Sequence, residues 1–149
     1  MLNLRIHPNV LKEQIIHGLG PKDTVLDGAN LMVRHDISAI VIFGDDGKLV
    51  GIVTERDLTR RVLADGLDSE ATALGDIMTK DPDTLSPDDA ILDALELMRT
   101  RRYRHLPVVK DTKVIGMVSI RDLYECVQDA LEQGMRETEA LVFSGEQND

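Results

Sequence analysis

A hydroxyl and a carboxylate three residues apart occur twice in this sequence, each time directly after a short apolar run. The first pair is Thr54 and Asp57, and the second is Ser119 and Asp122. The run predicts a buried strand and the residues after it predict a helix, so each pair should lie at a strand–helix junction. The free N–H groups and positive dipole end of a helix N-terminus attract anions. A hydroxyl there can hold a phosphate, and a carboxylate can hold the two hydroxyls of a ribose, which together suit a nucleotide.

The same residues also have a purely structural interpretation. Thr54 with Asp57, and Ser119 with Asp122, both fit an N-terminal capping box in which Asp replaces Glu or Gln. In that case the side chains satisfy backbone N–H groups and bind nothing else. A duplicated unit would duplicate its caps as well, so the residues alone leave both interpretations open.

The two junctions belong to a longer internal repeat. Residues 51–58 match residues 116–123 at an offset of 65, and upstream positions such as Pro21 and Pro87 match at 66. The one-residue difference falls in a turn, where Gly-Asp-Asp-Gly at 44–47 is replaced by a shorter segment in the second copy. The repeat therefore runs from about residue 10 to 64 and again from about 76 to 130.

Each copy predicts the order strand, helix, strand, strand, helix. The first copy gives a short strand at 15–16, a helix at 22–35, strands at 39–43 and 49–53, and a helix at 55–64. The second gives a strand at 83–85, a helix opened by Ser86 and Pro87 with an inner stripe of Ile91, Leu92, Leu95 and Met98, strands at 105–109 and 114–118, and a helix from 120 to about 142.

Neither copy has enough strands to be stable alone. We therefore expect an α+β fold in which residues 1–70 and 71–149 form two halves of one pseudo-symmetric unit, joined through a polar linker at 65–75. A chain of 149 residues can bury a core of that kind without disulfides or metals.

Composition excludes several classes of function. The net charge of −10 argues against general nucleic-acid binding, which depends on Lys and Arg. A single Cys and the lack of a long apolar run predict a cytoplasmic protein with no signal peptide and no membrane span. The four histidines show no metal-ligand spacing, and no nucleophile–base arrangement is visible, so we expect neither a metal site nor catalysis.

Beyond these patterns, the sequence resembles a known family. Gly-Ile-Val-Thr-Glu-Arg-Asp at 51–57, Gly-Met-Val-Ser-Ile-Arg-Asp at 116–122, Asp-Ile-Met-Thr at 76–79 and Arg-His-Leu-Pro-Val-Val at 104–109 are similar to the paired CBS (cystathionine β-synthase) repeats of a Bateman module. The resemblance covers nearly the whole chain. With no catalytic domain in the sequence, the chain is similar to the stand-alone bacterial CBS-pair proteins.

The resemblance implies a cleft between the repeats with up to two adenosine-type sites, and a disc-like homodimer formed through the helices. In such modules the Asp of the junction binds ribose, the hydroxyl binds phosphate, the short first strand meets the adenine, and basic residues at the start of the second strand meet the phosphates. The implied first site contains His17, Ser38, Ala39, Thr54, Arg56 and Asp57. The implied second site contains Thr84, Arg104, His105, Ser119, Arg121 and Asp122.

The first copy departs from the family pattern at one place. Ser38 and Ala39 stand where the second copy has Arg104 and His105, so the first site is poorer in phosphate-binding groups unless arginines of the second repeat reach across. We therefore expect a mononucleotide at the second site, with NAD or an unphosphorylated adenosine as candidates for the first.

These features predict a non-catalytic regulatory sensor. It would bind an adenine nucleotide, namely AMP, ADP, ATP or NAD(H), and signal to an unidentified partner protein by a change of shape. The alternative is a protein-interaction or scaffolding module without a nucleotide, in which both junctions are only helix caps.

Overall fold

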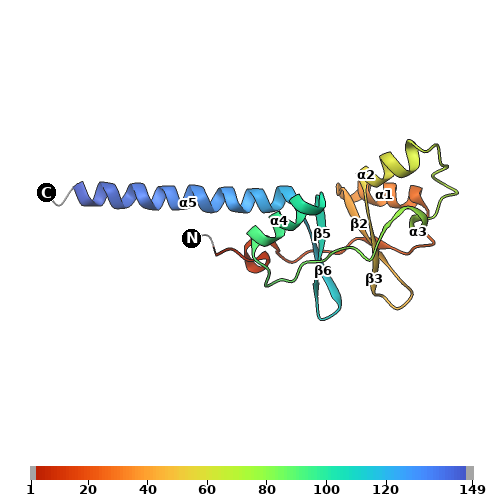
Figure 1. Ribbon diagram of the computed structural model, residues 1–149, viewed down its shortest axis with the longest axis horizontal. Helices are drawn as coiled ribbons and strands as arrows, with labels where there is room; N and C mark the ends of the chain where they lie inside the picture. Colours follow the sequence, from red (N-terminus) through yellow and green to blue (C-terminus); the bar gives the residue numbers. More distant parts are fainter. Residues whose placement is uncertain (1–2, 147–149) are drawn as a thin grey trace.

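Two small halves, each built of helices and strands, lie side by side in the computed structural model, which describes residues 3–146, and one long helix extends away from them (Figure 1). The first half contains the strands β1 (Gly18–Leu19), β2 (Ala39–Phe43) and β3 (Leu49–Thr54), and the helices α1 (Val25–His35), α2 (Glu55–Asp57) and η2 (Leu58–Leu63). The strand β4 (Thr79–Lys80) completes a sheet of order β1-β2-β3-β4. Only β1 and β2 are parallel in this sheet, and the other pairs are antiparallel.

The second half repeats this plan in a shorter form. It contains α4 (Ile91–Arg101), the antiparallel hairpin β5 (His105–Lys110) and β6 (Lys113–Ser119), and α5 (Ile120–Glu146). Leu85 takes the place of the first strand, since it forms a parallel bridge to Val108. The predicted α+β class and the order strand, helix, strand, strand, helix are therefore confirmed in both halves.

Each half has its own apolar core, and each core includes residues from outside the repeat that surrounds it. Ile6 and Leu11, near the N-terminus, are buried with Leu85, Met98 and Leu106 of the second half. The N–H of Ile6 donates to the carbonyl of Asp89 at 2.9 Å, which fixes this segment against the second half.

The segment between the repeats likewise packs on the first half. Leu74 and Ile77 of the short helix α3 (Leu74–Ile77) are buried beside Ile40 and Val53. The predicted polar linker at 65–75 is therefore wrong at its end, because Leu74 is 0% exposed. The division of the chain at residue 70 stays a prediction.

Glycines at matching places in the two repeats make these packings possible. A Cβ on Gly51 would collide with the side chain of Met78, and a Cβ on Gly116 would collide with that of Leu11. Each glycine lies in a strand of its hairpin, β3 or β6, and a segment from outside the repeat crosses over it. Such close approach to a strand is a recognised reason for glycine at that position.

Two predictions about helix and strand starts were wrong. The first strand lies at Gly18–Leu19 and not at 15–16, where Ile15 is 82% exposed. The helix α4 begins at Ile91 and not at Ser86, because Ala90 is held in an extended conformation by its bridge to Arg5.

The residues before α4 form a turn instead of a helix start. The backbone N–H of Ser86 donates to the carboxylate of Asp89 at 2.8 Å, and the N–H of Asp89 donates back to the carbonyl of Ser86 at 3.1 Å. The later helix start also changes which face is buried. Ile91, Ala94 and Met98 point into the core, whereas Leu92, predicted in the inner stripe, is 54% exposed.

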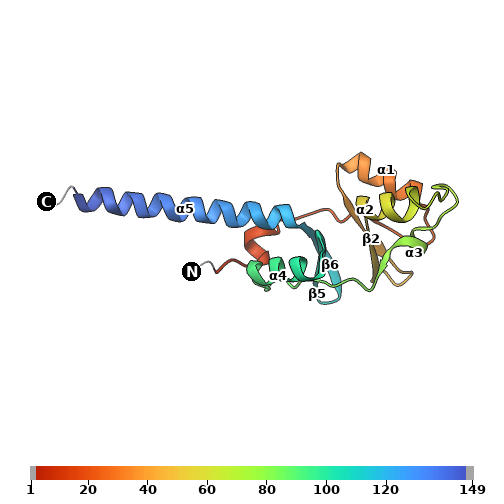
Figure 2. The same ribbon diagram turned by 45° about the horizontal axis from the view of Figure 1, so that its top comes forward.

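The helix α5 is longer than predicted and leaves the body of the protein (Figures 1 and 2). Its first turns are packed, with Leu123 fully buried and Val127 against the second core. Further along, the same stripe is open to solvent: Leu131 is 52% exposed and Met135 is 65% exposed. We call the projecting part, residues 128–146, the arm.

Within residues 3–146, no helix combines the length and the apolar character that a membrane span requires. The cytoplasmic location stays a prediction.

Candidate functional site

Both predicted junctions form reciprocal helix caps. The Thr54 hydroxyl accepts a hydrogen bond from the N–H of Asp57 at 3.2 Å, and Oδ2 of Asp57 accepts one from the N–H of Thr54 at 2.9 Å. The second junction matches it, with 3.1 Å from the N–H of Asp122 to the Ser119 hydroxyl and 2.9 Å for the return bond to Oδ2. The hydroxyl and the carboxylate of each junction therefore do cap a helix, as the structural interpretation predicts.

Capping leaves part of each carboxylate available. Every hydrogen bond that the two carboxylates accept within the caps ends on Oδ2, so Oδ1 of Asp57 and of Asp122 is not used by the cap. Oδ1 of Asp57 lies 3.7 Å from Nε of Arg61, on the next turn of the helix. A carboxylate has about four lone-pair sites, so one side chain can cap a helix and still accept hydrogen bonds from a ligand.

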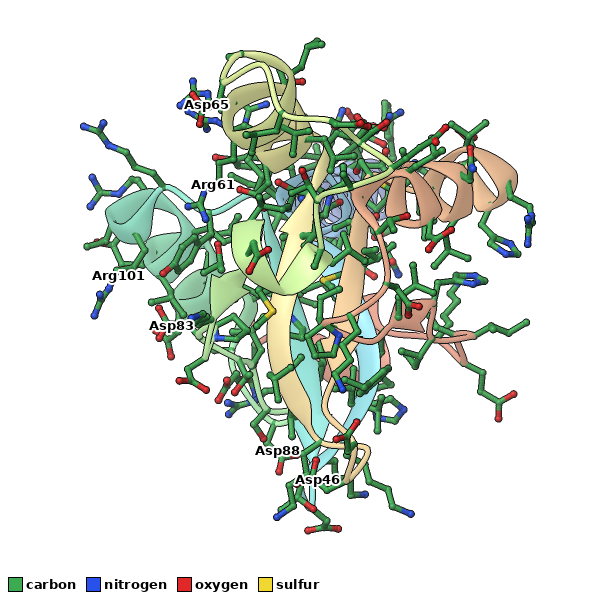
Figure 3. The ribbon with its side chains drawn as sticks, turned by 90° about the vertical axis from the view of Figure 1, so that its right-hand side faces the viewer. Asp46, Arg61, Asp65, Asp83, Asp88 and Arg101 are labelled. Atoms are coloured by element: carbon green, nitrogen blue, oxygen red, sulfur yellow. The ribbon has the colours of Figure 1, made fainter. Side chains whose placement is uncertain are left out.

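The first junction opens into a cavity of about 780 Å³ between the two repeats. From the first repeat, Thr54, Arg56 and Asp57 line it, and from the second repeat Arg104 and His105. The charged lining side chains are six arginines and three carboxylates: Arg56, Arg60, Arg61, Arg101, Arg102, Arg104, Glu55, Asp57 and Asp83. Arg61, Asp83 and Arg101 lie on the same side of the molecule in Figure 3. We call this the first cavity.

The second junction opens into another cavity of about 600 Å³, which we call the second cavity. Ser119 and Asp122 of the second repeat line it, together with His17, Ser38 and Ala39 of the first repeat. Ser38 and His105 line both cavities and so form a shared wall between them.

The structure therefore groups the predicted site residues differently from the expectation. Thr54, Arg56 and Asp57 were expected with His17, but they share a cavity with Arg104. The residues Ser119 and Asp122, expected with Arg104, share one with His17, Ser38 and Ala39. The reason is the arrangement of the repeats, which places the start of the second strand of each repeat opposite the junction of the other.

This exchange reverses the expected distribution of phosphate-binding groups. Arginines of the second repeat do reach across to the first junction, which was the open alternative.

Two predicted residues line neither cavity. Thr84 is exposed, although its neighbour Asp83 lines the first cavity. Arg121 is 85% exposed and pairs with Glu125 at 3.1 Å.

Sequence reasoning missed several of the lining arginines. Arg104 was assigned to a site, but its neighbours Arg101 and Arg102, which also line the first cavity, were not. Arg60 and Arg61 were not singled out, although Arg60 lies four residues after Arg56 and Arg61 lies four residues after Asp57, a spacing that brings side chains together on one face of a helix. That spacing was the available signal.

The shared wall contains a hydrogen bond between the repeats. The Ser38 hydroxyl oxygen and Nε2 of His105 lie 2.9 Å apart. Burial is the main cause that lowers the pKa of His105 from its ordinary value, while the negative charges of Asp122 and Glu55 oppose that shift and Arg104 adds to it. The imidazole is therefore favoured in its neutral form, which can donate or accept this bond.

A pair of stacked histidines lies beside the second cavity. The rings of His17 and His35 are stacked with centroids 3.8 Å apart. The pKa of His17 is lowered, chiefly by burial and then by the charge of His35. Within residues 3–146 no group of three or more His, Cys, Asp or Glu side chains is arranged to hold a metal ion.

Comparison with known proteins agrees with this architecture. The family model for the CBS domain matches residues 16–64 and again residues 74–129. The chain is 38% identical over 127 residues to the mitochondrial CBS domain-containing protein CBSX3 of Arabidopsis thaliana, which covers 83% of this chain and 62% of that protein. It spans only 20% of a longer relative from the same plant, CBSCBSPB2.

Solved structures give the same result. A CBS-domain protein from Burkholderia ambifaria is 36% identical and superposes with a TM-score of 0.73, covering 77% of this chain and 84% of the other. The CBS domain protein PAE2072 from Pyrobaculum aerophilum, solved in complex with AMP, is 27% identical with a TM-score of 0.71, covering 80% and 89%.

Proposed function

The chain belongs to the CBS-domain family, and from that premise we propose that it is a non-catalytic regulatory module that binds an adenine nucleotide between its two repeats. The observation that carries the proposal is the first cavity. There the Thr54–Asp57 junction of one repeat faces Arg101, Arg102 and Arg104 of the other.

Each group in the first cavity has a place in this binding mode. Oδ1 of Asp57, which the cap does not use, accepts hydrogen bonds from the two ribose hydroxyls. The phosphates lie near the helix N-terminus at Thr54 and among the arginines, whose guanidinium groups bind phosphate oxygens in pairs. The base packs on apolar lining residues, for which Ile52, Pro82 and Leu106 are the candidates.

The charge of the first cavity favours ligands with more than one phosphate. Its six arginines exceed its three carboxylates by three positive charges. ATP and ADP therefore fit this balance better than AMP. NAD has two phosphates, but they carry only two negative charges and its nicotinamide is cationic, so it fits no better than AMP. The AMP complex of PAE2072 supports an adenine nucleotide as the class of ligand.

A thermal-shift panel with AMP, ADP, ATP, NAD, NADH and S-adenosylmethionine, with GTP as the control, tests this proposal. A ligand at 100 times its dissociation constant stabilises the folded state by about 2.7 kcal/mol. For a chain of this length that is a rise in melting temperature of roughly 5–10 °C. A flat panel in nucleotide-free protein would contradict the proposal.

The projecting arm supports dimerisation as a second property of the module. Leu131, Met135 and Leu141 form an exposed apolar stripe along it, and Tyr124 continues the stripe onto the body. We propose that a second copy of the chain covers this stripe, so that the module is a homodimer. A protein of unknown identity that responds to the nucleotide would then bind the dimer. A scaffolding module without nucleotide would keep the dimer and show no ligand-dependent change.

A further inference from the structure

The two cavities differ in the charge of the side chains that line them. The first cavity has six arginines. Among the described residues that line the second cavity there is no arginine or lysine, and three carboxylates are present, those of Glu13, Asp36 and Asp122. The repeats are alike in fold, but the clefts they form are opposite in sign.

The histidines of the second cavity do not supply the missing positive charge. His17 and His105 both line it, and burial is the main cause that lowers the pKa of each. Of the groups around them, His35 and Arg104 add to that shift, whereas Asp122 and Glu55 oppose it for His105. Both imidazoles are therefore neutral at neutral pH, and the three carboxylates leave the cavity with a negative charge.

The remaining lining suits the other parts of a nucleoside. Ile16, Ile37, Val41 and Met117 supply apolar surface on which a flat base can lie. The junction has the same hydroxyl–carboxylate spacing as the first one, and the cap uses only Oδ2 of Asp122. The second oxygen of Asp122 is thus available for the hydroxyls of a ribose.

We propose that the second cavity takes a purine nucleoside whose 5′ substituent carries no phosphate. Recognition of the ribose by the junction carboxylate rests on the function proposed above. A phosphate in the second cavity would lie beside three carboxylates without an arginine or lysine to neutralise it, which disfavours the phosphorylated ligand by repulsion. Two chemically different adenosine ligands would then be sorted between the clefts by charge.

Calorimetric titration of the full chain, first saturated with ATP, tests the sorting. Adenosine should bind with one equivalent, and AMP, which differs from it by one phosphate, should bind at least about tenfold more weakly. Equal or tighter binding of AMP to the ATP-saturated protein would overturn the proposal. So would competition of adenosine with ATP for one shared site.

Variants of the two junctions assign the adenosine to a cavity. Asp122→Ala should weaken adenosine binding about 10- to 100-fold, as expected for a lost hydrogen bond to a charged group, and Asp57→Ala should leave it within about twofold. Asp27→Ala is the matched control, because Asp27 forms the same kind of cap with Thr24 at the start of α1 and lines neither cavity. Loss of adenosine binding in Asp57→Ala instead would overturn the assignment.

A second variant tests the charge itself and does not depend on the cap. Glu13 and Asp36 are exposed, so Glu13→Gln with Asp36→Asn should fold normally. Asn also tolerates the left-handed conformation of residue 36, where φ is 51°. The preference for adenosine over AMP should shrink by about threefold or more, since two like charges are removed. An unchanged preference would contradict the charge argument.

These experiments separate the two proposals. If ATP does not bind while adenosine binds and depends on Asp122, the function proposed for the first cavity fails and the second-cavity site stands. If ATP binds and adenosine does not, only the further inference fails.

Discussion

The hydroxyl oxygen of Ser38 lies 2.9 Å from Nε2 of His105, and this contact joins the two repeats at the wall between the two cavities. At the offset of 66, Ser38 occupies the position of Arg104 and Ala39 occupies that of His105. The repeats therefore differ where they meet, with small side chains on one side and large basic ones on the other. That difference gives the first cavity Arg104, one of its six arginines, at a position where the other repeat has only Ser38.

The first prediction concerns pH and His105. Because burial lowers the pKa of this imidazole below its ordinary value of 6.5, the unfolded chain takes up a proton at a higher pH than the folded one. The contribution of the buried neutral imidazole to the free energy of unfolding is therefore complete above about pH 6.5 and decreases as the pH falls below that value. His105→Gln should make the melting temperature less dependent on pH in the range of about 5 to 7. A variant with unchanged pH dependence would contradict this assignment.

The second prediction separates capping from ligand binding at Asp57. Asp57→Ala and Asp27→Ala should each lower the free energy of unfolding by about 1 kcal/mol, since each removes one side of a capping box. Only Asp57→Ala should also weaken ATP binding, by about 10- to 100-fold. Chemical denaturation and calorimetry measure the two effects. Equal ATP affinity in both variants would leave Asp57 as a cap alone.

The third prediction concerns the arginines of the second repeat. Arg104→Gln should weaken ATP binding about 10-fold or more, because a charge-assisted contact to phosphate is lost. Arg99→Gln is the control, since Arg99 is 75% exposed, pairs with Glu96 at 2.6 Å and lines neither cavity. The effect of Arg104→Gln should decrease at high salt. Similar losses in both variants would indicate a general effect of surface charge.

The fourth prediction tests the packing of the N-terminal segment. Ile6→Ala should destabilise the protein by about 2–5 kcal/mol, because Ile6 is fully buried in the second core. Ile15→Ala, in the same segment but 82% exposed, should change stability by less than about 0.5 kcal/mol. Denaturant titrations compare the two. A small effect of Ile6→Ala would mean that this segment does not belong to the core.

The fifth prediction concerns the arm. Leu131→Gln with Met135→Gln should shift the mass measured by light scattering from dimer towards monomer, because both side chains lie on the exposed apolar stripe. Glu132→Gln, on a neighbouring face of the same helix, should leave the mass unchanged. The melting temperature of the monomeric body should change little, since the arm beyond Gln128 lies outside both cores in the described chain. An unchanged dimer in the double variant would place the interface elsewhere.

Much of this fold can be predicted from the sequence because the repeat is regular. Apolar runs bounded by turns define the two hairpins, and matched offsets reveal that the halves are alike. Where the prediction was wrong, a distant part of the chain decided the local structure. The bridge between Arg5 and Ala90 delays α4 until Ile91, and no local signal around Ser86 contains that information.

The sequence identifies most residues of the candidate site, but it does not show which of them share a cavity. The junctions at Asp57 and Asp122 follow from type and spacing alone. Which junction faces Arg104 depends on how the repeats pack, and that relationship connects residues 47 positions apart through tertiary structure. The arginines at 60 and 61 were missed because helix-surface charges usually face solvent.

Calorimetric titration of nucleotide-free protein with ATP is the measurement that tests the central claim most directly. We expect saturable binding that is reduced about 10- to 100-fold by Asp57→Ala and unaffected by Asp27→Ala. Absence of binding in the wild-type protein, or equal binding in both variants, would contradict a nucleotide site at the Thr54–Asp57 junction.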